Sequence, residues 1–337
     1  MASSRPRLRV LDFGTVSPLR SQTLWHALGY GETGSAATLS FARPQSPYVC
    51  LGLHRNAEEL DSVAVDRYQL PVYRRMVGGG PVYLDPDQLF FQISLPVSQV
   101  PPRRSQALAE LLAPAVRALV RLGVPAVLDE HGEISVDGRK VCGHGAGQIE
   151  DTVLVVGNLI TGFDHERAAA VLRVSSPATR AEVLRLMRRY VAATPVDPNA
   201  WRQAMVEEYA AQLGADTLPG RLDTDEQAAV HRLDALFTSA EWLQGTPRPA
   251  KPVRTIKIRA GVWVHEWDHP DACTVLSIAD GKVDNVLVEP RGDRTPTPAL
   301  TSLVGAAVDD ARTALSAAAT APLAAALAAT QPGQVSA

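Results

Sequence analysis

The chain has 337 residues, of which 46% are hydrophobic and 20% charged, and its net charge at pH 7 is −3. This composition fits a globular protein of roughly two domains and argues against a strongly basic binder of nucleic acid or membranes. Three widely spaced cysteines favour reduced thiols over a disulfide framework or a zinc site, and without an apolar signal core or membrane-length window we expect a cytoplasmic protein.

The first half of the chain is rich in strand patterns. Apolar runs and alternation predict strands over 8–13, 37–43, 48–53, 72–75, 80–84, 88–95, 126–128, 133–136, 139–141 and 152–160. Helical spacing predicts helices over 21–30, with a serine cap, and over 56–70 and 105–122. The run 152–160 is apolar enough for a central strand.

The second half changes character twice. A loop and a Ser-Ser-Pro break at 171–177 precede predicted helices over 180–190, 199–214 and 223–244. Three prolines within 245–252 mark a linker, after which strands over 255–264, 273–278 and 283–289, with turns at 280–281 and 291–292, lead to an alanine-rich helical region over 299–329. We therefore expect a first domain over 1–245, a linker over 246–252 and a small domain over 253–337, with a frayed end at 331–337.

A wall for an anionic ligand is predicted at residues 74–85. Arg74 and Arg75 stand just before the three consecutive glycines at 78–80, which are followed by an extended apolar run. Glycine lets the backbone approach a ligand closely, and arginine pairs bidentately with carboxylate or phosphate. By itself this motif also fits an ordinary glycine-rich hairpin beside a solvated basic pair.

A second motif lies at residues 137–148. An Asp-Gly turn leads into Lys140 on a short strand, and a glycine-rich segment follows. A lysine on a strand is usually solvated. Beside an arginine-rich loop and an anionic ligand, however, its ammonium group can neutralise charge that builds up during acyl or phosphoryl transfer. Activation of a carboxylate needs such converging positive groups, together with exclusion of water.

The order of four segments resembles the lipoate and biotin protein ligase family, most closely the lipoate-protein ligases and their octanoyltransferase relatives. The segments are 48–56, 74–85, 138–147 and 153–164. The resemblance covers most of residues 8–245, and 255–261 with 280–283 resemble weakly the accessory domain of bacterial lipoate ligases. It implies an α+β fold, in which helices flank a mixed β-sheet and a small α+β C-terminal accessory domain follows.

The resemblance also implies a reaction. Lipoate or octanoate would be activated with ATP and Mg²⁺ to an acyl-adenylate and transferred to a lysine of a lipoyl-type carrier domain. Independently of the resemblance, the lack of a long heptad or an obvious apolar patch favours a monomer, and the small net charge argues against a nucleic-acid or membrane partner. Lys140 would contact the acyl-adenylate, and the segment from Arg173 to Arg180 resembles a loop that orders over the nucleotide. The implied acyl and nucleotide site comprises Arg74, Arg75, Gly78, Gly79, Gly80, Val82, Tyr83, Asp85, Gln88, Gly143, Gly145, Ala146 and Asn158. No metal ligand set is assigned.

Two departures from the family pattern stand near this site. Residues 143–148 are richer in glycine than is usual, and Val156-Gly157-Asn158 replaces a His-Gly pair. These changes leave open a specialised branch that serves an unusual carrier protein. Leu84, Phe90 and Val141 are candidates for lining an acyl tunnel, although residues of their type more often pack a core.

Two other functions compete with the ligase. An ATP-independent transferase would need a cysteine thioester, but its relatives place that cysteine upstream of the lysine motif, where residues 126–130 hold none. Cys142 is the remaining candidate for the nucleophile, because strand alternation places it on the same face as Lys140; the alternative is that it is a small packing residue. Cys50 and Cys273 are expected to be structural. An inactive acyl-binding protein is the third possibility, and the retained arginines, glycines and lysine argue against it.

Overall fold

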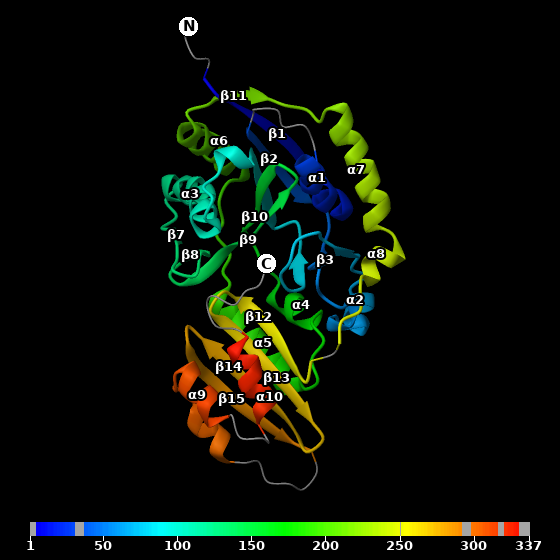
Figure 1. The fold of residues 1–337 in the computed structure, drawn as a ribbon, viewed down its shortest axis with the longest axis vertical. Helices are drawn as coiled ribbons and strands as arrows, with labels where there is room; N and C mark the ends of the chain where they lie inside the picture. The colour runs from blue at the N-terminus through cyan, green and yellow to red at the C-terminus, as the bar shows by residue number, and fades with distance from the viewer. Residues whose placement is uncertain (1–4, 31–36, 250, 292–297, 316–319, 330–337) are drawn as a thin grey trace. The chain divides into compact units, whose positions relative to one another are not determined.

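The computed structural model describes residues 5–30, 37–249, 251–291, 298–315 and 320–329 (Figure 1). The chain forms two compact units. The first contains Met1–Ala57, Val65–Asp164 and Ala192–Thr246, and the second contains Glu58–Ala64, His165–Val191 and Pro247–Ala337. Both units are therefore built from separate stretches of chain, whereas the division predicted from the linker at 246–252 is continuous and stays a prediction.

An eight-stranded mixed sheet forms the centre of the first unit, in the order β11-β1-β2-β6-β10-β9-β8-β7. Strand β1 runs parallel to β2 and β11, and the other neighbours are antiparallel. The strands are β1 (Arg7–Val16), β2 (Ala37–Pro44), β6 (Gln88–Pro96), β7 (Val127–Leu128), β8 (Ile134–Val136), β9 (Arg139–Ile149), β10 (Thr152–Ile160) and β11 (Asp216–Pro219). The predicted strand at 152–160 is confirmed as β10, inside the sheet.

Helices cover both faces of this sheet (Figure 1), which confirms the predicted fold class. Helices α3 (Arg104–Arg121) and α6 (Pro198–Leu213) pack on one face, where Leu112, Met205 and Phe91 share the main core. Helices α1 (Pro18–Tyr30) and α7 (Thr224–Phe237) pack together on the other, and α8 (Ala240–Gln244) follows. The serine that caps α1 is Ser17, whose Oγ accepts a hydrogen bond from the Arg20 N–H at 3.2 Å, and Pro18 opens the helix.

A three-stranded sheet, β4-β3-β5, also belongs to the first unit. It consists of β3 (Tyr48–Leu51), β4 (Val72–Arg74) and β5 (Val82–Leu84). Tyr48, Cys50, Leu84 and Phe90 form its buried contact cluster. The arginine and glycine motif connects β4 to β5, so this small sheet fixes both ends of the loop.

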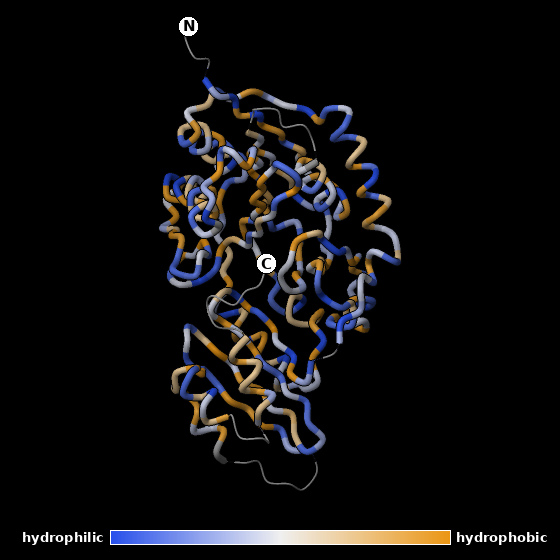
Figure 2. The backbone as a smooth tube through the Cα atoms, viewed as in Figure 1, coloured by the Kyte–Doolittle hydropathy of each residue, from blue (hydrophilic) through white to orange (hydrophobic). Residues whose placement is uncertain are grey.

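The second unit is an antiparallel meander with helices. Its strands are β12 (Val253–Arg259), β13 (Val262–His269), β14 (Ala272–Ala279) and β15 (Lys282–Pro290), and its helical segments are α4 (His165–Ala170), α5 (Pro177–Tyr190), η3 (Pro298–Leu303), α9 (Val308–Ala314) and α10 (Ala321–Ala328). Apolar residues recur along these strands (Figure 2), and Leu276, Ala311 and Leu323 are among those that form the core. Glu182 on α5 accepts hydrogen bonds from Ser277 at 2.6 Å and Asn285 at 3.2 Å, which ties α5 to the meander.

Several predicted elements are interrupted. The strand expected over 255–264 is a hairpin that turns at Ala260–Gly261, where Gly261 has a φ of +80°. The helix expected over 56–70 is instead η1 (Ala57–Glu59) and α2 (Ser62–Arg67), because Leu60 bridges to Leu172 between them. Likewise, 223–244 is split where Ser239 caps α8. Helix α4 and strand β11 were not predicted.

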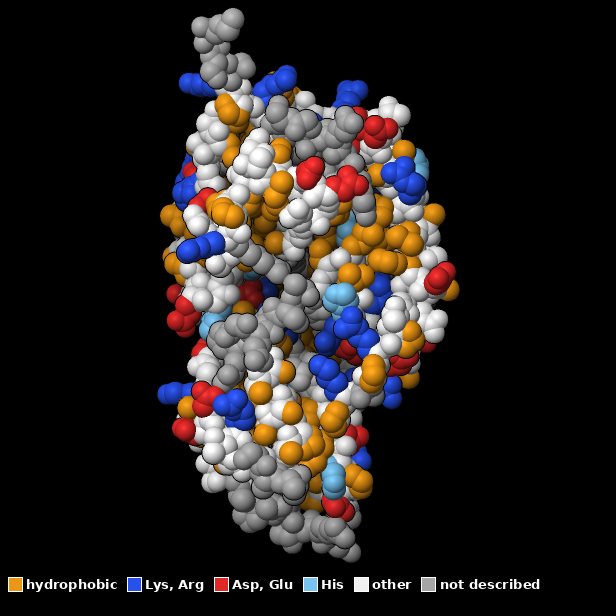
Figure 3. Space-filling model, in the orientation of Figure 1, with side chains coloured by type: hydrophobic (Ala, Val, Ile, Leu, Met, Phe, Trp, Pro, Cys, Tyr) orange, Lys and Arg blue, Asp and Glu red, His pale blue; other side chains and the backbone are white. Residues whose placement is uncertain are grey.

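The region expected to be helical over 299–329 contains η3, α9 and α10 as separate segments, and Gly305, at a φ of +86°, interrupts it. Gly292 of the predicted turn at 291–292, and the end at 331–337, lie outside the described residues. Within the part of the chain that the structure describes, no helix is long and apolar enough to cross a membrane. Basic and acidic side chains are interspersed over most of the face drawn in Figure 3, in keeping with the small net charge of −3.

Candidate active site

The loop between β4 and β5, residues 75–80, is folded around the side chain of Arg75; we call it the Arg–Gly loop. The Arg75 guanidinium donates to the carbonyl of Gly78 at 2.7 Å and to that of Gly80 at 3.0 Å. It also donates to the carbonyl of Cys50 on β3 at 3.1 Å. Gly79 has a φ of +98°, a conformation that favours glycine. A Cβ added to Gly78 or Gly80 would meet no described atom within 4 Å, so the backbone there faces open space.

Two further contacts fix the loop. A Cβ on Gly52, which follows β3, would stand 2.1 Å from the Gly79 oxygen, so only glycine fits there. The Met76 N–H donates to Nε2 of His26 on α1 at 3.0 Å, and the other ring nitrogen of His26 lies 2.7 Å from the Gln22 carbonyl. Burial lowers the pKa of His26 to about 3. The neutral imidazole can therefore donate to Gln22 and accept from the loop.

The structure brings the two predicted motifs together. The strand predicted over 139–141 is longer than expected: strand β9 continues from Arg139 to Ile149 and includes the glycine-rich segment. Cβ atoms on Gly145 and Gly147 would stand 3.8 and 3.3 Å from the side chain of Val77 in the Arg–Gly loop. Because residues two apart share a face of a strand, these glycines form a floor beneath the loop. Their small size allows the loop to approach the sheet.

A row of polar side chains continues from this floor. A Cβ on Gly143 would lie 2.4 Å from Oδ1 of Asn158 on β10. The Asn158 amide donates to Oε1 of Gln88, and the Gln88 amide donates to the Tyr83 carbonyl at 3.3 Å. Buried Asp85 lies nearby and is hydrogen-bonded to Gln88. Gly143, Asn158, Gln88 and Asp85 are thus brought together as one polar strip, although they come from three different segments of the sequence.

Burial raises the pKa of Asp85 to about 6, and the charges of Asp87 and Asp164 add to this effect. Its Oδ1 accepts a hydrogen bond from the Asp87 N–H at 3.0 Å. Asp85 therefore titrates close to neutral pH. Of its neighbours on β5, Tyr83 is buried and packs edge-on against Phe163, whereas the Val82 side chain is exposed. The assignment of Val82 to the site stays a prediction.

Lys140 is paired with a carboxylate that the motif pattern did not reveal. Its Nζ lies 2.8 Å from Oε2 of Glu133, whose side chain is only 5% exposed. The His144 Nδ1 is 4.0 Å from the same oxygen. Ser135 pairs with Lys140 across β8 and β9, and Glu133 lies two residues before Ser135, so the sequence spacing could have located this partner. An anionic ligand at Lys140 has to share the ammonium group with Glu133.

Arg74 corrects the prediction that both arginines face a ligand. Its side chain is 2% exposed, and all three guanidinium nitrogens donate to backbone carbonyls. The acceptors, at 2.6 to 3.1 Å, belong to Gly52, Leu53, Arg55, Trp242, Leu243 and Gln244. Arg74 therefore joins the turn after β3 to the end of α8. Its role in this structure is to hold the first unit together.

Cys142 corrects the prediction that it shares a face with Lys140. Ile134 and Ser135 are consecutive on β8, yet their partners on β9 are Cys142 and Lys140, so Val141 is the extra residue of a β-bulge. The partners of two consecutive residues face opposite sides of the sheet. Val141 and Cys142 are both buried in the main core, and burial raises the pKa of Cys142 to about 12. Ala146 is partly buried and packs against that core, and its assignment to the site stays a prediction.

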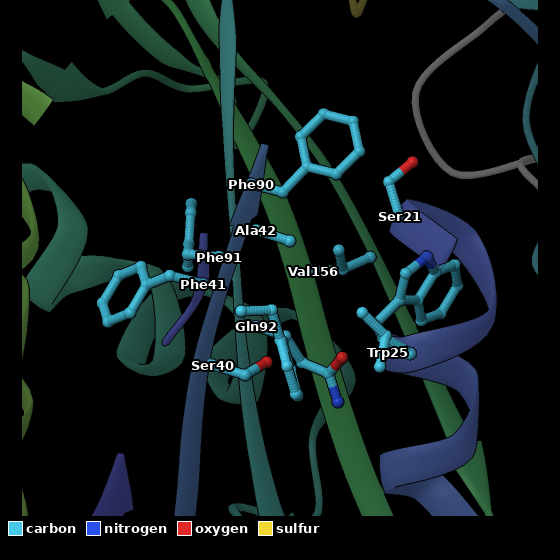
Figure 4. Close-up of a pocket in the computed structure, with 11 residues that line it drawn as sticks. Ser21, Trp25, Ser40, Phe41, Ala42, Phe90, Phe91, Gln92 and Val156 are labelled. Atoms are coloured by element: carbon cyan, nitrogen blue, oxygen red, sulfur yellow. The ribbon is translucent and has the colours of Figure 1, made fainter. Parts of the chain in front are cut away.

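An apolar pocket lies between α1 and the large sheet. Trp25 and Ser21 on α1 stand opposite Val156 and Phe90 on the strands (Figure 4). The cavity has a volume of about 20 Å³ and is lined by Phe13, Ser21, Leu24, Trp25, Ser40, Phe41, Ala42, Phe90, Phe91, Gln92 and Val156. Phe90 thus lines a pocket, as predicted, whereas Leu84, which packs with Phe90, and Val141, in the main core, are not among its lining residues.

The loop after α4 is held in the second unit. Arg180 donates to the carbonyls of Ala169, Ala170 and Leu172 and to Oδ2 of Asp61 at 2.9 Å. The Ser175 N–H donates to buried Glu266 at 2.7 Å. The ordering of the segment from Arg173 to Arg180 over a nucleotide stays a prediction. Over the described residues, no group of three or more His, Cys, Asp or Glu side chains is placed to hold a metal ion.

Comparison with known proteins gives relatives of two kinds. The octanoyltransferase LipM of Moorella thermoacetica is 26% identical over 265 residues, which cover 70% of this chain and 97% of that protein. Lipoate–protein ligase 1 of Staphylococcus aureus is 26% identical over 147 residues, which cover 43% of this chain and 44% of that protein. The chain thus spans nearly the whole of the first relative and less than half of the second.

Solved structures share the fold. A bi-partite lipoate protein ligase from Thermoplasma acidophilum matches with a TM-score of 0.66 at 21% identity, over 74% of this chain and 99% of that one. LipL1 of P. falciparum, in complex with lipoate, matches with a TM-score of 0.59 at 13% identity, over 92% of this chain and 94% of that one. The family model described as the lipoyl protein ligase A/B catalytic domain matches residues 22–210, more than half of the chain. The chain therefore belongs to the lipoyl protein ligase A/B catalytic domain family.

Proposed function

We propose that the protein is an ATP-dependent lipoate-protein ligase. It would convert lipoate or octanoate to an acyl-adenylate and transfer the acyl group to a lysine of a lipoyl-type carrier domain. The observation that carries this proposal over thioester transfer is that Cys50, Cys142 and Cys273 are all at most 2% exposed. Burial raises the pKa of each thiol, which opposes formation of the thiolate nucleophile. A ligase needs no such nucleophile.

We propose one orientation for the acyl acid in the first unit. Gln88, Phe90 and Gln92 alternate along one face of β6. Gln88 belongs to the polar strip, and the other two line the apolar pocket. We place the carboxylate by the polar strip and the apolar chain in the pocket. The exposed backbone of Gly78 and Gly80, together with Arg75, would then face the carboxylate and the phosphate that it attacks.

In the first step a carboxylate oxygen attacks the α-phosphorus of ATP, the bond to the β-phosphate oxygen breaks, and pyrophosphate leaves. Arg75 and Lys140 would offset the negative charge of the two reacting groups. In the second step the carrier lysine amine attacks the acyl carbonyl, AMP leaves, and the amine releases a proton. Mg²⁺ commonly binds through one or two carboxylates together with substrate phosphates, and it would reach this site with the phosphates of ATP.

Pyrophosphate release tests the proposal directly. The protein is incubated with ATP, Mg²⁺ and either lipoate or octanoate, and release is compared with a reaction that lacks the acid. We expect acid-dependent release, and mass analysis of an added lipoyl-type carrier should reveal one acyl group on a lysine. If no acyl acid stimulates release, the protein is not a ligase; an inactive acyl-binding protein would then bind the acid without turnover. Residence in the cytoplasm and a monomeric state are further parts of this proposal.

Octanoyl transfer is the second candidate, because the chain covers 97% of the length of an octanoyltransferase relative. A transferase would acylate the carrier from acyl carrier protein without ATP, and Cys142→Ser would abolish that reaction. For the ligase we expect Cys142→Ser to keep full ATP-dependent activity. We also expect iodoacetamide to label Cys142 only after unfolding, because the folded thiol is buried. Rapid labelling of the native protein at Cys142 would favour the transferase.

A further inference from the structure

A buried amide lies in the wall of the apolar pocket. Gln92 on β6 is 1% exposed, and its Nε2 donates to Ser94 Oγ at 2.7 Å. Its Oε1 is buried and has no hydrogen-bond partner among the described residues. Figure 4 shows the amide pointing into the space between the sheet and α1, toward Trp25. A buried polar atom without a partner is costly, so this atom is unusual within an apolar wall.

The position of Gln92 along the strand gives it a place on the ligand. Four residues separate Gln88, in the polar strip, from Gln92, which corresponds to about 13 Å along an extended strand. Phe90 lies between them on the same face. An acyl acid with its carboxylate by the polar strip therefore passes Phe90 and ends at the Gln92 amide. Ser40 on β2, paired directly with Gln92, is a second polar residue at this end.

We propose that Gln92 selects acyl acids that carry a hydrogen-bonding group at the end of the chain, such as a terminal hydroxyl. This inference rests on the proposed function, because it assumes that the pocket takes the acyl chain. Octanoate ends in a methyl group and leaves the amide without a partner, whereas a terminal hydroxyl supplies one. A hydroxyl both donates and accepts, so it matches the amide whichever way the oxygen and nitrogen are oriented.

A bound water is the alternative partner for this amide, because the cavity has room for about one water and Ser21 and Ser40 are further polar residues in its lining. A ligand hydroxyl is held in place by the rest of its own chain. We therefore expect a ligand hydroxyl to displace any water found there.

The test compares three acids with the wild-type protein by isothermal titration calorimetry: octanoate, ω-hydroxyoctanoate and a hydroxyoctanoate with the hydroxyl at mid-chain. We expect ω-hydroxyoctanoate to bind about tenfold more tightly than octanoate, a factor that one satisfied buried hydrogen bond can supply. The mid-chain isomer should bind more weakly than either, because its hydroxyl lies beside Phe90 and Val156. Competition in pyrophosphate release should give the same order.

The variant Gln92→Met has nearly the same shape and lacks the amide. It should bind octanoate at least as tightly as the wild type and lose the preference for ω-hydroxyoctanoate, whereas Gln106→Met, at an exposed position on α3, should keep it. Equal or tighter binding of octanoate by the wild type, or a preference unchanged in Gln92→Met, overturns the inference and leaves the ligase standing. If neither acid binds, the proposed function and the inference fail together. The wild-type comparison decides the matter even if Gln92→Met does not fold.

Discussion

The substitution Arg74→Lys separates a structural arginine from a ligand-binding one. The guanidinium reaches two groups of carbonyls, one on residues 52–55 and one on residues 242–244. A lysine ammonium keeps the charge, but it offers three donors on a single nitrogen and cannot span both groups. At least one group of buried carbonyls then loses its partner.

The cost follows from these contacts. A hydrogen bond to a charged group contributes roughly 1.5–3 kcal/mol, and a buried acceptor left without a partner is similarly expensive. Loss of about two such bonds should lower the free energy of unfolding by roughly 3–5 kcal/mol. At about 2–4 °C per kcal/mol, the melting temperature should fall by roughly 10 °C.

Thermal unfolding followed by circular dichroism measures this fall, with Arg75→Lys as the matched control. Arg75 is partly exposed and donates mainly to its own loop, so its replacement should shift the melting temperature by no more than about 3 °C. Arg75→Lys should instead reduce acid-dependent pyrophosphate release. If Arg74→Lys melts like the wild type but no longer binds the acyl acid or ATP, Arg74 acts on the ligand and the structural reasoning is wrong.

Three further outcomes follow from the site. Lys140→Met should abolish pyrophosphate release and cost about 3 kcal/mol of stability, because it leaves Glu133 buried without its cation. Adding Glu133→Gln to this variant should restore the melting temperature but not the activity. If the melting temperature is not restored, the pairing of Lys140 with Glu133 is contradicted. The folded pKa of His26, lowered to about 3 by burial, lies below the ordinary 6.5, so the unfolded state takes up the proton first as pH falls. Stability should therefore decline below pH 6.5 by up to about 1.4 kcal/mol per pH unit, and an identical decline in His26→Gln would rule His26 out as the cause. Gly52→Ala should lower activity, because its Cβ would stand 2.1 Å from a carbonyl oxygen of the Arg–Gly loop. Gly78→Ala should leave the melting temperature unchanged, because its Cβ would meet no described atom within 4 Å. Equal melting temperatures and equal activities of the two variants would contradict this difference.

Local pattern predicted the architecture well because strands and helices depend mainly on apolar spacing. The run 152–160 and the amphipathic helix near 105–122 match β10 and α3 closely. The Arg–Gly loop and Lys140 were also found from sequence, since adjacent arginines, glycines and a lysine after a turn are visible as motifs. Gln88 and Asn158 were assigned through the family resemblance instead, and the structure joins them by a hydrogen bond.

Failures arose where a long-range partner decided the outcome. The carbonyls that occupy Arg74 lie as far as 170 residues away, so no local signal distinguishes it from Arg75. The extra residue of the β-bulge, Val141, places Cys142 on the opposite face of the sheet from Lys140. The alternation of side chains along a strand does not by itself predict a bulge. The predicted strand at 139–141 stopped short of the glycines at 145 and 147, because their use in a strand depends on the close approach of Val77.

The second unit limits how this chain can be divided. Its meander begins after residue 246, which suggests a detachable module, yet α5 belongs to that unit and lies within the stretch that interrupts the first. A chain cut at the linker would keep α5 but lose Ser277 and Asn285, and would leave Glu182 with two fewer hydrogen bonds. Exchange of the C-terminal region between relatives would therefore need a matched exchange of residues 165–191. Helix α5 and the meander belong to one structural unit, although the 55 residues of the first unit from Ala192 to Thr246 separate them in sequence.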